Sequence, residues 1–364
     1  MKITNVRACQ PVTETSPADW RTSIGQILVA VDTDCGITGY GVGGGGFAGI
    51  HVVQTVLRDV LLGEDPDRIE GLWSTMYDAT LAFGQKGIVL MAMSGVDLAL
   101  WDMRGRAEKQ SVSELLGGAK QTRLPTYITV WDNEALAKVA DRPHRGFKLH
   151  LGEQASQNES IDAFADRIAG ELREARRLIG PDRELMADAW MKWSRPAAEA
   201  VIERIADVNL SWLEEPLPLD DEAGYEALVG LGSVPIAGGE HEYTSAAFRK
   251  LVDRQLHSVL QPDVNWVGGL TELIRIYELA SEHDDIRVCP HRGAEIWSLS
   301  ALAVLDPDPL AESGRPWMSW VNGQPPIVDG WIEIPDRPGF GLDIDEAALR
   351  ICPTPPLAEQ WLSR

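Results

Sequence analysis

The chain has 364 residues, of which 44% are hydrophobic and 24% charged, a composition typical of a globular protein with a large buried core. Its net charge of −22 argues against nucleic acid or an anionic membrane as a partner, because both require basic surfaces. No apolar run approaches the roughly 18 residues of a membrane span, and the four cysteines are far apart without a C-x-x-C pair. We therefore expect a cytoplasmic protein without a zinc site or a disulfide framework.

The first 120 residues show strand patterns before helix patterns, which predicts an α+β domain. The candidate strands are Ile3–Ala8, Ile24–Val31 and a third strand entered through the turn at residues 32–41, and the candidate helices are Gly49–Leu62, Asp67–Ala79 and Ile88–Glu108. A single (β/α)₈ barrel needs roughly 250 residues, which leaves about 100 residues of this chain for a second domain. We place this N-terminal domain at residues 1–120.

Two loops in this domain have alternative interpretations. The polar stretch between Thr13 and Thr22 is predicted to be either an exposed connection or a lid that brings Trp20 or Arg21 to a pocket. The glycine run Gly43–Gly46 lacks the lysine and the glycine spacing of a phosphate-binding loop, so we interpret it as a mobile loop.

From Leu124 onward, strand and helix patterns alternate, which predicts parallel strands connected by helices. The eight candidate strands are Leu124–Thr129, Gly146–His150, Glu184–Asp188, Leu210–Glu214, Val234–Gly238, Ser258–Gln261, Ile286–Cys289 and, with the poorest pattern, Leu310–Glu312. We predict a modified (β/α)₈ barrel of the TIM type over residues 121–316. The tail at 317–364 is irregular and rich in proline and tryptophan, and it is expected to return to the N-terminal domain as part of an α+β capping domain.

Three of the predicted strands end at or just before an acidic residue. Asp188, Glu214 and Glu240 follow one another at intervals of 26 residues, the length of one strand-loop-helix-loop unit. Carboxylates on neighbouring strand ends would repel one another unless a cation lay between them. The all-oxygen set suits Mg²⁺ before Ca²⁺ or Mn²⁺, whereas zinc would favour nitrogen or sulfur.

The other strand ends carry ionisable residues that suit proton transfer. Lys148 and His150 are two positions apart and therefore point to the same face of their strand. Asp263 and His291 end consecutive strands, so the carboxylate could orient the imidazole and stabilise its protonated form. An Asp after a strand is often only a helix cap, but caps do not explain this ordered set of Lys, His, Asp and Glu. The layout predicts removal of a weakly acidic proton beside a carboxylate.

Several motifs resemble the mandelate racemase branch of the enolase superfamily. They are V-D-L-A-L-W-D at 96–102, E-E-P at 214–216, G-E-H at 239–241, Q-P-D at 261–263 and G-G-L-T at 268–271. The resemblance covers essentially the whole chain, and within the branch D-A-W-M at 188–191, G-E-H and Q-P-D-V-N-W at 261–266 are most similar to the L-rhamnonate dehydratase group. Members of the superfamily use a Lys or His base with Mg²⁺.

The resemblance implies a role for each matching residue. Asp188, Glu214 and Glu240 match the Mg²⁺ ligands, and His291 with Asp263 matches the acid/base dyad. Further assignments are Glu312 as the acid that hydrogen-bonds a substrate carboxylate oxygen, Lys148 and His150 as further catalytic candidates, and Arg21, Trp20, His241 and Trp190 as substrate contacts. Lys148 is expected either to support a developing enediolate or only to neutralise the carboxylates. Trp190 is equally compatible with core or subunit packing.

One departure from the branch bears on the reaction. The Lys-x-Lys pattern of the family is Lys148-Leu149-His150 here, so a second lysine base is lost, although His150 could stand in for it. Val42 also replaces a glutamate of many relatives, a difference that concerns the capping domain. Racemisation needs a competent group on each face of the substrate, whereas β-elimination can use His291 alone.

These features favour a Mg²⁺-dependent acid-sugar dehydratase, a hydro-lyase that converts an aldonate such as L-rhamnonate to the 2-keto-3-deoxy acid. The alternatives are a racemase, epimerase or cycloisomerase that uses His150 and His291, and a non-catalytic barrel stabilised by its metal. We expect a small carboxylate substrate, a homo-oligomer, and neither nucleic acid nor membrane as a partner.

Overall fold

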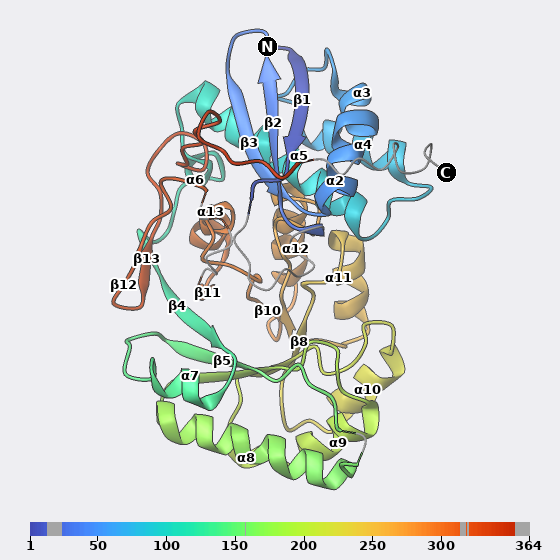
Figure 1. Ribbon diagram of the computed structural model, residues 1–364, viewed down its shortest axis with the longest axis vertical. Coiled ribbons are helices and arrows are strands. Elements are labelled where there is room, and N and C mark those ends of the chain that lie inside the picture. The colour runs from blue at the N-terminus through green and yellow to red at the C-terminus, as the bar shows by residue number, and fades with distance from the viewer. Residues whose placement is uncertain (13–23, 157, 314–317, 319, 354–364) are drawn as a thin grey trace. The chain divides into compact units, whose positions relative to one another are not determined.

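The computed structural model describes residues 1–12, 24–156, 158–313, 318 and 320–353 (Figure 1). The chain forms two compact units, the first made of Met1–Val112, Pro316–Gly323 and Arg337–Arg364 and the second of Ser113–Arg315 and Gln324–Asp336. The tail is thus divided between both units, whereas we expected all of 317–364 to return to the N-terminal domain. The reason is that part of the tail forms a strand that pairs with the barrel.

The first unit is an α+β domain, as predicted. Its antiparallel sheet has the order β1-β2-β3. The strands are β1 (Ile3–Cys9), β2 (Ile27–Thr33) and β3 (Thr38–Gly43), and the helices are α2 (Gly46–Val52), the π-helical turn η1 (Val53–Leu57), α3 (Arg58–Leu61), α4 (Ile69–Thr80) and α5 (Ile88–Glu108). The expected helix Gly49–Leu62 is therefore one helical stretch with a π-helical middle turn.

Close contact between β3 and α5 holds this unit together. Gly39, Gly41 and Gly43 alternate along β3 and so share one face, and a Cβ on any of them would collide with the backbone carbonyl oxygens of α5. Helix α5 begins and ends where its periodicity predicts, and most of its side chains are buried because the helix is apolar on nearly all sides. Glycine at these three positions allows the helix backbone to approach the sheet.

Asp102 links α5 to two other segments of the same unit. Its fully buried carboxylate accepts the N–H of Tyr40 at 2.9 Å and the N–H of Phe340 at 3.0 Å, and it pairs with Arg106 at 2.6 Å. Burial raises the pKa of Asp102 despite the positive charge of Arg106. These bonds attach the C-terminal segment to β3 and α5.

The second unit contains the predicted parallel barrel. Its eight parallel strands are β4 (Arg123–Val130), β5 (Gly146–His150), β6 (Glu184–Asp188), β7 (Trp212–Glu214), β8 (Ile236–Gly238), β9 (Val259–Leu260), β10 (Arg287–Val288) and β11 (Ala311–Glu312). Strands β4 to β10 are paired in chain order, and β11 pairs with β4. Each observed strand lies within one or two residues of its predicted range at the C-terminal end, which is the end that carries the candidate site.

Helices follow the first seven barrel strands. They are α7 (Asn133–Ala137), α8 (Ile161–Ile179), α9 (Arg195–Arg204), α10 (Glu222–Gly230), α11 (Thr244–Asp253), α12 (Leu270–Ala280) and α13 (Ile296–Leu305), with short helices α6 (Val112–Leu115) and η2 (Ala206–Val208) elsewhere. Side chains of Asp132, Ser160 and Asp221 cap α7, α8 and α10 by accepting a backbone N–H of the first turn. The short helix α7 was not predicted, since five residues carry too little periodicity.

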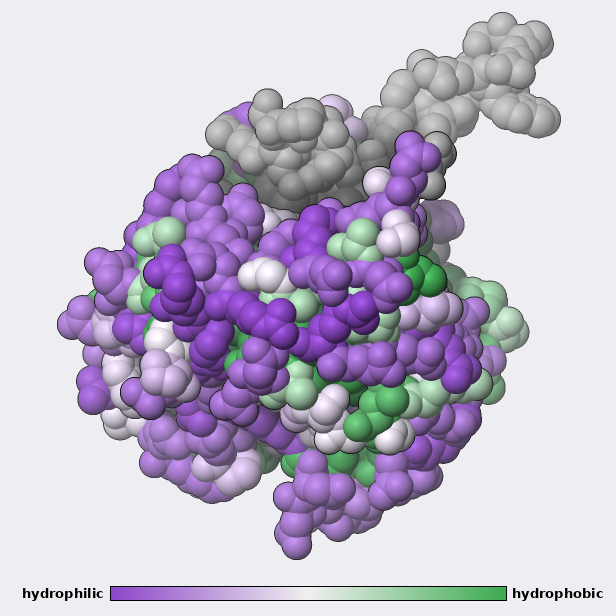
Figure 2. Space-filling model, turned by 90° about the horizontal axis from the view of Figure 1, so that it is seen from below, coloured by the Kyte–Doolittle hydropathy of each residue, from purple (hydrophilic) through white to green (hydrophobic). Residues whose placement is uncertain are grey.

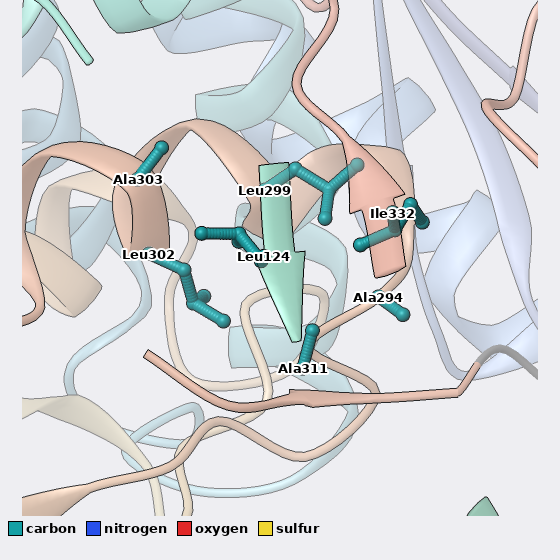
Figure 3. Close-up of a cluster of buried hydrophobic side chains, with 7 residues drawn as sticks. All are labelled: Leu124, Ala294, Leu299, Leu302, Ala303, Ala311 and Ile332. Carbon is teal, nitrogen blue, oxygen red and sulfur yellow. The ribbon is translucent and has the colours of Figure 1, made fainter. Parts of the chain in front are cut away.

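A hairpin from the tail completes the second unit. Strands β12 (Ile327–Val328) and β13 (Trp331–Glu333) form it, and β13 pairs antiparallel with the first residues of β4 (Figure 1). Side chains of β4, β11, β13 and α13 form one buried apolar cluster there (Figure 3). Its members are Leu124, Ala294, Leu299, Leu302, Ala303, Ala311 and Ile332. Burial of Ile332 in this cluster explains why the hairpin packs with the barrel.

Asp306, after α13, gives the barrel a pH-dependent stability. Burial raises its pKa to about 6, and the carboxyl accepts hydrogen bonds from Tyr277 and from the N–H of Asp308, each at 3.0 Å. The folded state therefore binds this proton more tightly than the unfolded state, so its contribution to stability is complete below pH 4 and is lost as the pH rises to about 6. We expect Asp306→Asn to stabilise the protein by up to about 3 kcal/mol above pH 6 and hardly at pH 4. Urea unfolding at both pH values measures this, and an equal change at both would contradict it.

The face shown in Figure 2 is mostly hydrophilic, with hydrophobic residues in small separate areas. Among the described residues, no helix is both long enough and apolar enough to cross a membrane.

Candidate active site

Strand register brings the predicted site residues together at the C-terminal ends of the barrel strands. His150 on β5 is the register partner of Asp188 on β6, and Asp188 is the partner of Glu214 on β7. Glu240 follows β8 by two residues, and Glu312 ends β11. All four carboxylates are buried, with at most 7% of each residue exposed. Four buried acids at one end of a barrel require compensating positive charge.

Lys148 supplies part of that charge. Its ammonium group is fully buried and lies 2.8 Å from Glu214 Oε1, 3.2 Å from Glu312 Oε1 and 4.0 Å from Asp188 Oδ2. It also lies over the ring of Tyr127 at 5.8 Å. Lys148 therefore faces three of the site carboxylates at once. This favours neutralisation of the carboxylates over support of a developing enediolate as its role.

Glu214 is held by donors from three strands. Its Oε2 atom accepts hydrogen bonds from Lys148 at 2.9 Å, from the indole of Trp212 at 3.2 Å and from the amide of Gln261 at 2.7 Å. Its Oε1 atom accepts a hydrogen bond from Lys148 at 2.8 Å. The carboxylate is thus oriented with Oε2 enclosed, and Oε1 is the oxygen better placed to bind a cation.

Asp188 is the acid that most needs a cation. Burial, together with repulsion from Glu214 and Glu240, raises its pKa well above the usual range, and Lys148 only partly opposes this. Its Oδ1 accepts the N–H of Trp190 at 2.9 Å. Trp190 and Met191 both have positive φ, 47° and 61°, so a tight turn fixes the carboxylate at the strand end.

Glu240 lies between two imidazoles. His291 Nε2 is 2.8 Å from its Oε2, and His241 Nδ1 is 3.5 Å from its Oε1. Burial alone would raise the pKa of Glu240, but the two histidines outweigh it and lower that pKa well below normal. His241 also bonds Glu215 at 2.9 Å, and its own pKa is raised to about 9 because the two glutamates outweigh burial.

The tightest acid–histidine group in the described part of the chain includes only one of the three predicted ligands. Ligand atoms of Glu215, Glu240 and His241 all lie within 4.8 Å of one another. Glu214 instead faces Lys148, and Glu240 faces the histidines. The ligand atoms of Asp188, Glu214 and Glu240 therefore do not all lie within 4.8 Å of one another.

His291 and Asp263 form the predicted pair, and a third residue joins it. His291 Nδ1 lies 2.8 Å from Asp263 Oδ2, and the same oxygen accepts bonds from Arg292 Nε at 2.9 Å and Nη2 at 2.5 Å. Burial opposes ionisation of Asp263, but Arg292 and His291 lower its pKa. Burial lowers the pKa of His291, yet Glu240 and Asp263 raise it to about 10. The imidazole is thus held between two carboxylates.

Glu312 is occupied by protein donors. Its Oε1 accepts the hydroxyl of Thr129 at 2.5 Å, and its Oε2 accepts the N–H of Arg292 at 2.8 Å. His291 Nε2 lies 4.0 Å from the same Oε2. This carboxylate therefore lies beside the dyad and Lys148.

His150 lies in a row of aromatic side chains. Its ring centroid is 4.3 Å from that of Trp131 and 6.2 Å from that of Trp190, and its Nε2 is 4.0 Å from Asp188 Oδ2. The N–H of Gly152 donates to His150 Nδ1 at 3.3 Å, so the neutral ring carries its proton on Nε2. In this tautomer, Nε2 is a donor directed toward the site.

The structure accounts for most of the predicted site residues. Trp20 and Arg21 lie outside the described residues, so the lid hypothesis stays a prediction. No role was predicted for Gln261, Trp131 or Arg292, although Gln261 lies in the Q-P-D motif, Trp131 follows β4 directly and Arg292 follows His291. The only feature of the sequence that could have indicated these three residues is their position near a strand end. Their residue types do not reveal which side chains they contact.

The donor set fits a hard divalent cation. Asp188, Glu214 and Glu240 are buried and offer only oxygen ligands, and burial with repulsion from Glu214 and Glu240 raises the pKa of Asp188. Lys148 alone cannot balance Asp188, Glu214 and Glu312. Mg²⁺ would supply that charge and leave coordination positions open for a substrate.

The fold and the acids at its strand ends place this chain among two-domain (β/α)-barrel proteins with an α+β N-terminal domain. Residues 4–117 match the N-terminal domain of the mandelate racemase and muconate lactonizing enzyme family, and residues 131–348 match the enolase C-terminal domain-like family. The chain belongs to the enolase superfamily, in its mandelate racemase branch.

Individual relatives agree with this assignment. An L-rhamnonate dehydratase from Saccharopolyspora erythraea is 34% identical over 340 residues, which cover 90% of this chain and 85% of the relative. The structure of rhamnonate dehydratase from Gibberella zeae complexed with Mg is 27% identical, with a TM-score of 0.83 and 95% of both chains covered. The 3,6-anhydro-D-galactonate cycloisomerase from Zobellia galactanivorans is 26% identical, with a TM-score of 0.82 over 95% of this chain and 98% of that chain.

Proposed function

We propose that the protein is a Mg²⁺-dependent acid-sugar dehydratase, a hydro-lyase that acts on an aldonate and, in particular, on L-rhamnonate. The observation that carries this proposal is the buried His291–Asp263 pair beside the acids Asp188, Glu214 and Glu240. The 34% identity to an L-rhamnonate dehydratase and the likeness to a Mg-complexed rhamnonate dehydratase support the same reaction class.

In the proposed reaction His291 moves one proton twice. Once Nε2 has lost its own proton and its contact with Glu240, it takes the proton from C2 of the acid sugar, while Asp263 holds Nδ1 and stabilises the protonated ring. Mg²⁺ bound by Asp188, Glu214 and Glu240 would stabilise the negative charge that develops at the substrate carboxylate. Lys148 and Glu312 lie beside that position, where Lys148 adds positive charge and Glu312 contacts a carboxylate oxygen.

The second half of the reaction breaks the C3–O bond. His291 returns the proton to the departing 3-hydroxyl, water leaves, and the resulting enol rearranges to the 2-keto-3-deoxy acid. One base is sufficient if the C2 proton and the 3-hydroxyl lie on the same face of the substrate. His150 stands where the family pattern has a second lysine, and this loss supports elimination over racemisation.

The test is incubation of the purified protein with Mg²⁺ and a panel of stereoisomeric aldonates and aldarates that includes L-rhamnonate. We expect a 2-keto acid to form from L-rhamnonate. If L-rhamnonate is inert and another aldonate reacts, the reaction class stands and the substrate is wrong. Deuterium incorporation at C2 in D₂O without loss of water would favour a racemase, epimerase or cycloisomerase. Mg²⁺ binding without any turnover or exchange would favour a non-catalytic barrel.

A further inference from the structure

Arg292, directly after the proposed base, is unusual in both its burial and its backbone conformation. Only 1% of the residue is exposed, and its φ of 54° lies in the left-handed region that non-glycine residues rarely adopt. A backbone in this region costs free energy unless its surroundings hold it there. The contacts of Arg292 show what holds it.

Arg292 binds two carboxylates of the site with different groups. Its backbone N–H donates to Glu312 Oε2 at 2.8 Å, and its guanidinium donates through Nε and Nη2 to Asp263 Oδ2 at 2.9 and 2.5 Å. The guanidinium also lies over the ring of Trp266, 5.2 Å from its centroid. Trp266 in turn packs against the ring of His291 at a centroid distance of 6.0 Å.

These contacts leave Asp263 no freedom to rotate. Its Oδ1 accepts the N–H of Asn265 at 2.8 Å, and its Oδ2 accepts a hydrogen bond from Arg292. Because each oxygen has its own donor, rotation of the carboxylate would break both hydrogen bonds. The remaining bond of Oδ2 goes to Nδ1 of His291 at 2.8 Å. A fixed carboxylate fixes the plane of the imidazole, because that bond is directional.

We propose that Arg292 is a positioning residue for proton transfer: it clamps Asp263 and thereby fixes the orientation of the His291 ring. This inference rests on the proposed function for its kinetic consequences, but its structural part does not depend on any substrate. Arg292 acts through Asp263 and does not touch the reacting atoms.

The first test uses Arg292→Met, which keeps the length of the side chain and removes the guanidinium. We expect kcat for dehydration to fall by about 10- to 100-fold, as outer-shell substitutions do, with KM and Mg²⁺ affinity nearly unchanged. Arg292→Lys should recover only part of kcat, because lysine restores the positive charge but not the two parallel N–H donors of the guanidinium. A loss of thermal stability with normal kcat per folded molecule would overturn the proposal.

Arg292→Gly separates the two contacts of this residue. Glycine adopts positive φ freely and keeps the N–H that binds Glu312, so the backbone contact stays while the whole side chain is lost. We expect added guanidinium ion to restore part of kcat in this variant, whereas the same concentration of sodium chloride should not. Arg145→Met is the matched control, since Arg145 pairs with Glu184 and Asp308 before the start of β5. It should affect stability alone.

A second readout is independent of turnover. In ¹⁵N-histidine-labelled protein, the Nδ1–H proton of His291 hydrogen-bonded to Asp263 should give a downfield resonance, assigned by its absence in His291→Asn. We expect Arg292→Met and Arg292→Gly to shift or broaden it, and Arg145→Met to leave it unchanged. An unaltered resonance in both Arg292 variants would refute the clamp. If the wild type turns over no acid sugar, the proposed function fails while this measurement still decides the role of Arg292.

Discussion

His291→Asn is expected to lower the rate of acid-sugar dehydration by roughly 10²–10⁴-fold, the range that a general acid/base contributes. The physical reason is that the imidazole, held by Asp263 at 2.8 Å, is the group proposed to take the C2 proton and return it to the leaving hydroxyl. Exchange of the C2 proton with D₂O should disappear together with dehydration. Calorimetric titration should still show Mg²⁺ binding, because the three acids remain.

His144→Asn provides the control for this substitution. His144 is also buried in the barrel unit, where its Nδ1 bonds Thr126 at 2.8 Å, but it lies before β5 and so away from the C-terminal strand ends. We expect it to lower stability and to leave C2 exchange intact. If His291→Asn retained full exchange, another group would be the base, and His150 would be the first candidate.

Asp188→Asn is expected to abolish Mg²⁺ binding and turnover while making the metal-free protein more stable. Burial and repulsion from Glu214 raise the pKa of Asp188, so the ionised acid destabilises the metal-free fold at neutral pH. Asparagine is neutral and similar in shape, and its side-chain oxygen can still accept the N–H of Trp190. The wild type should gain stability on Mg²⁺ addition, by about 2.7 kcal/mol at 100 times Kd, and the variant should not.

Thermal melts with and without Mg²⁺, combined with calorimetry, measure both effects. Asp132→Asn is a suitable control, since this carboxylate only caps α7 by accepting the N–H of Ala135 at 2.6 Å. It should bind Mg²⁺ as the wild type does. A metal-free Asp188→Asn protein that melts below the wild type would contradict the charge argument, and unchanged Mg²⁺ affinity would remove Asp188 from the ligand set.

The sequence by itself determined the architecture and the position of most site residues. Periodicity predicted the bounds of α5, and the even spacing of Asp188, Glu214 and Glu240 indicated neighbouring strand ends. The spacing is informative because residues at the ends of successive barrel strands are separated by the length of one strand-loop-helix-loop unit. The order of strand and helix patterns predicted the α+β domain, and the sequence motifs indicated the family, which the comparisons confirm.

Only the tertiary structure decided which of these residues meet and how. It divided the tail between the two units, because β13 pairs with β4 and buries Ile332. It also brought Arg292 into hydrogen bonding with Asp263, and Gln261 with Glu214. Such contacts join residues from different strands or depend on one left-handed backbone angle, and no sequence period encodes them. Sequence thus determined which chemical groups stand at the strand ends, whereas folding decided which hydrogen bonds orient them.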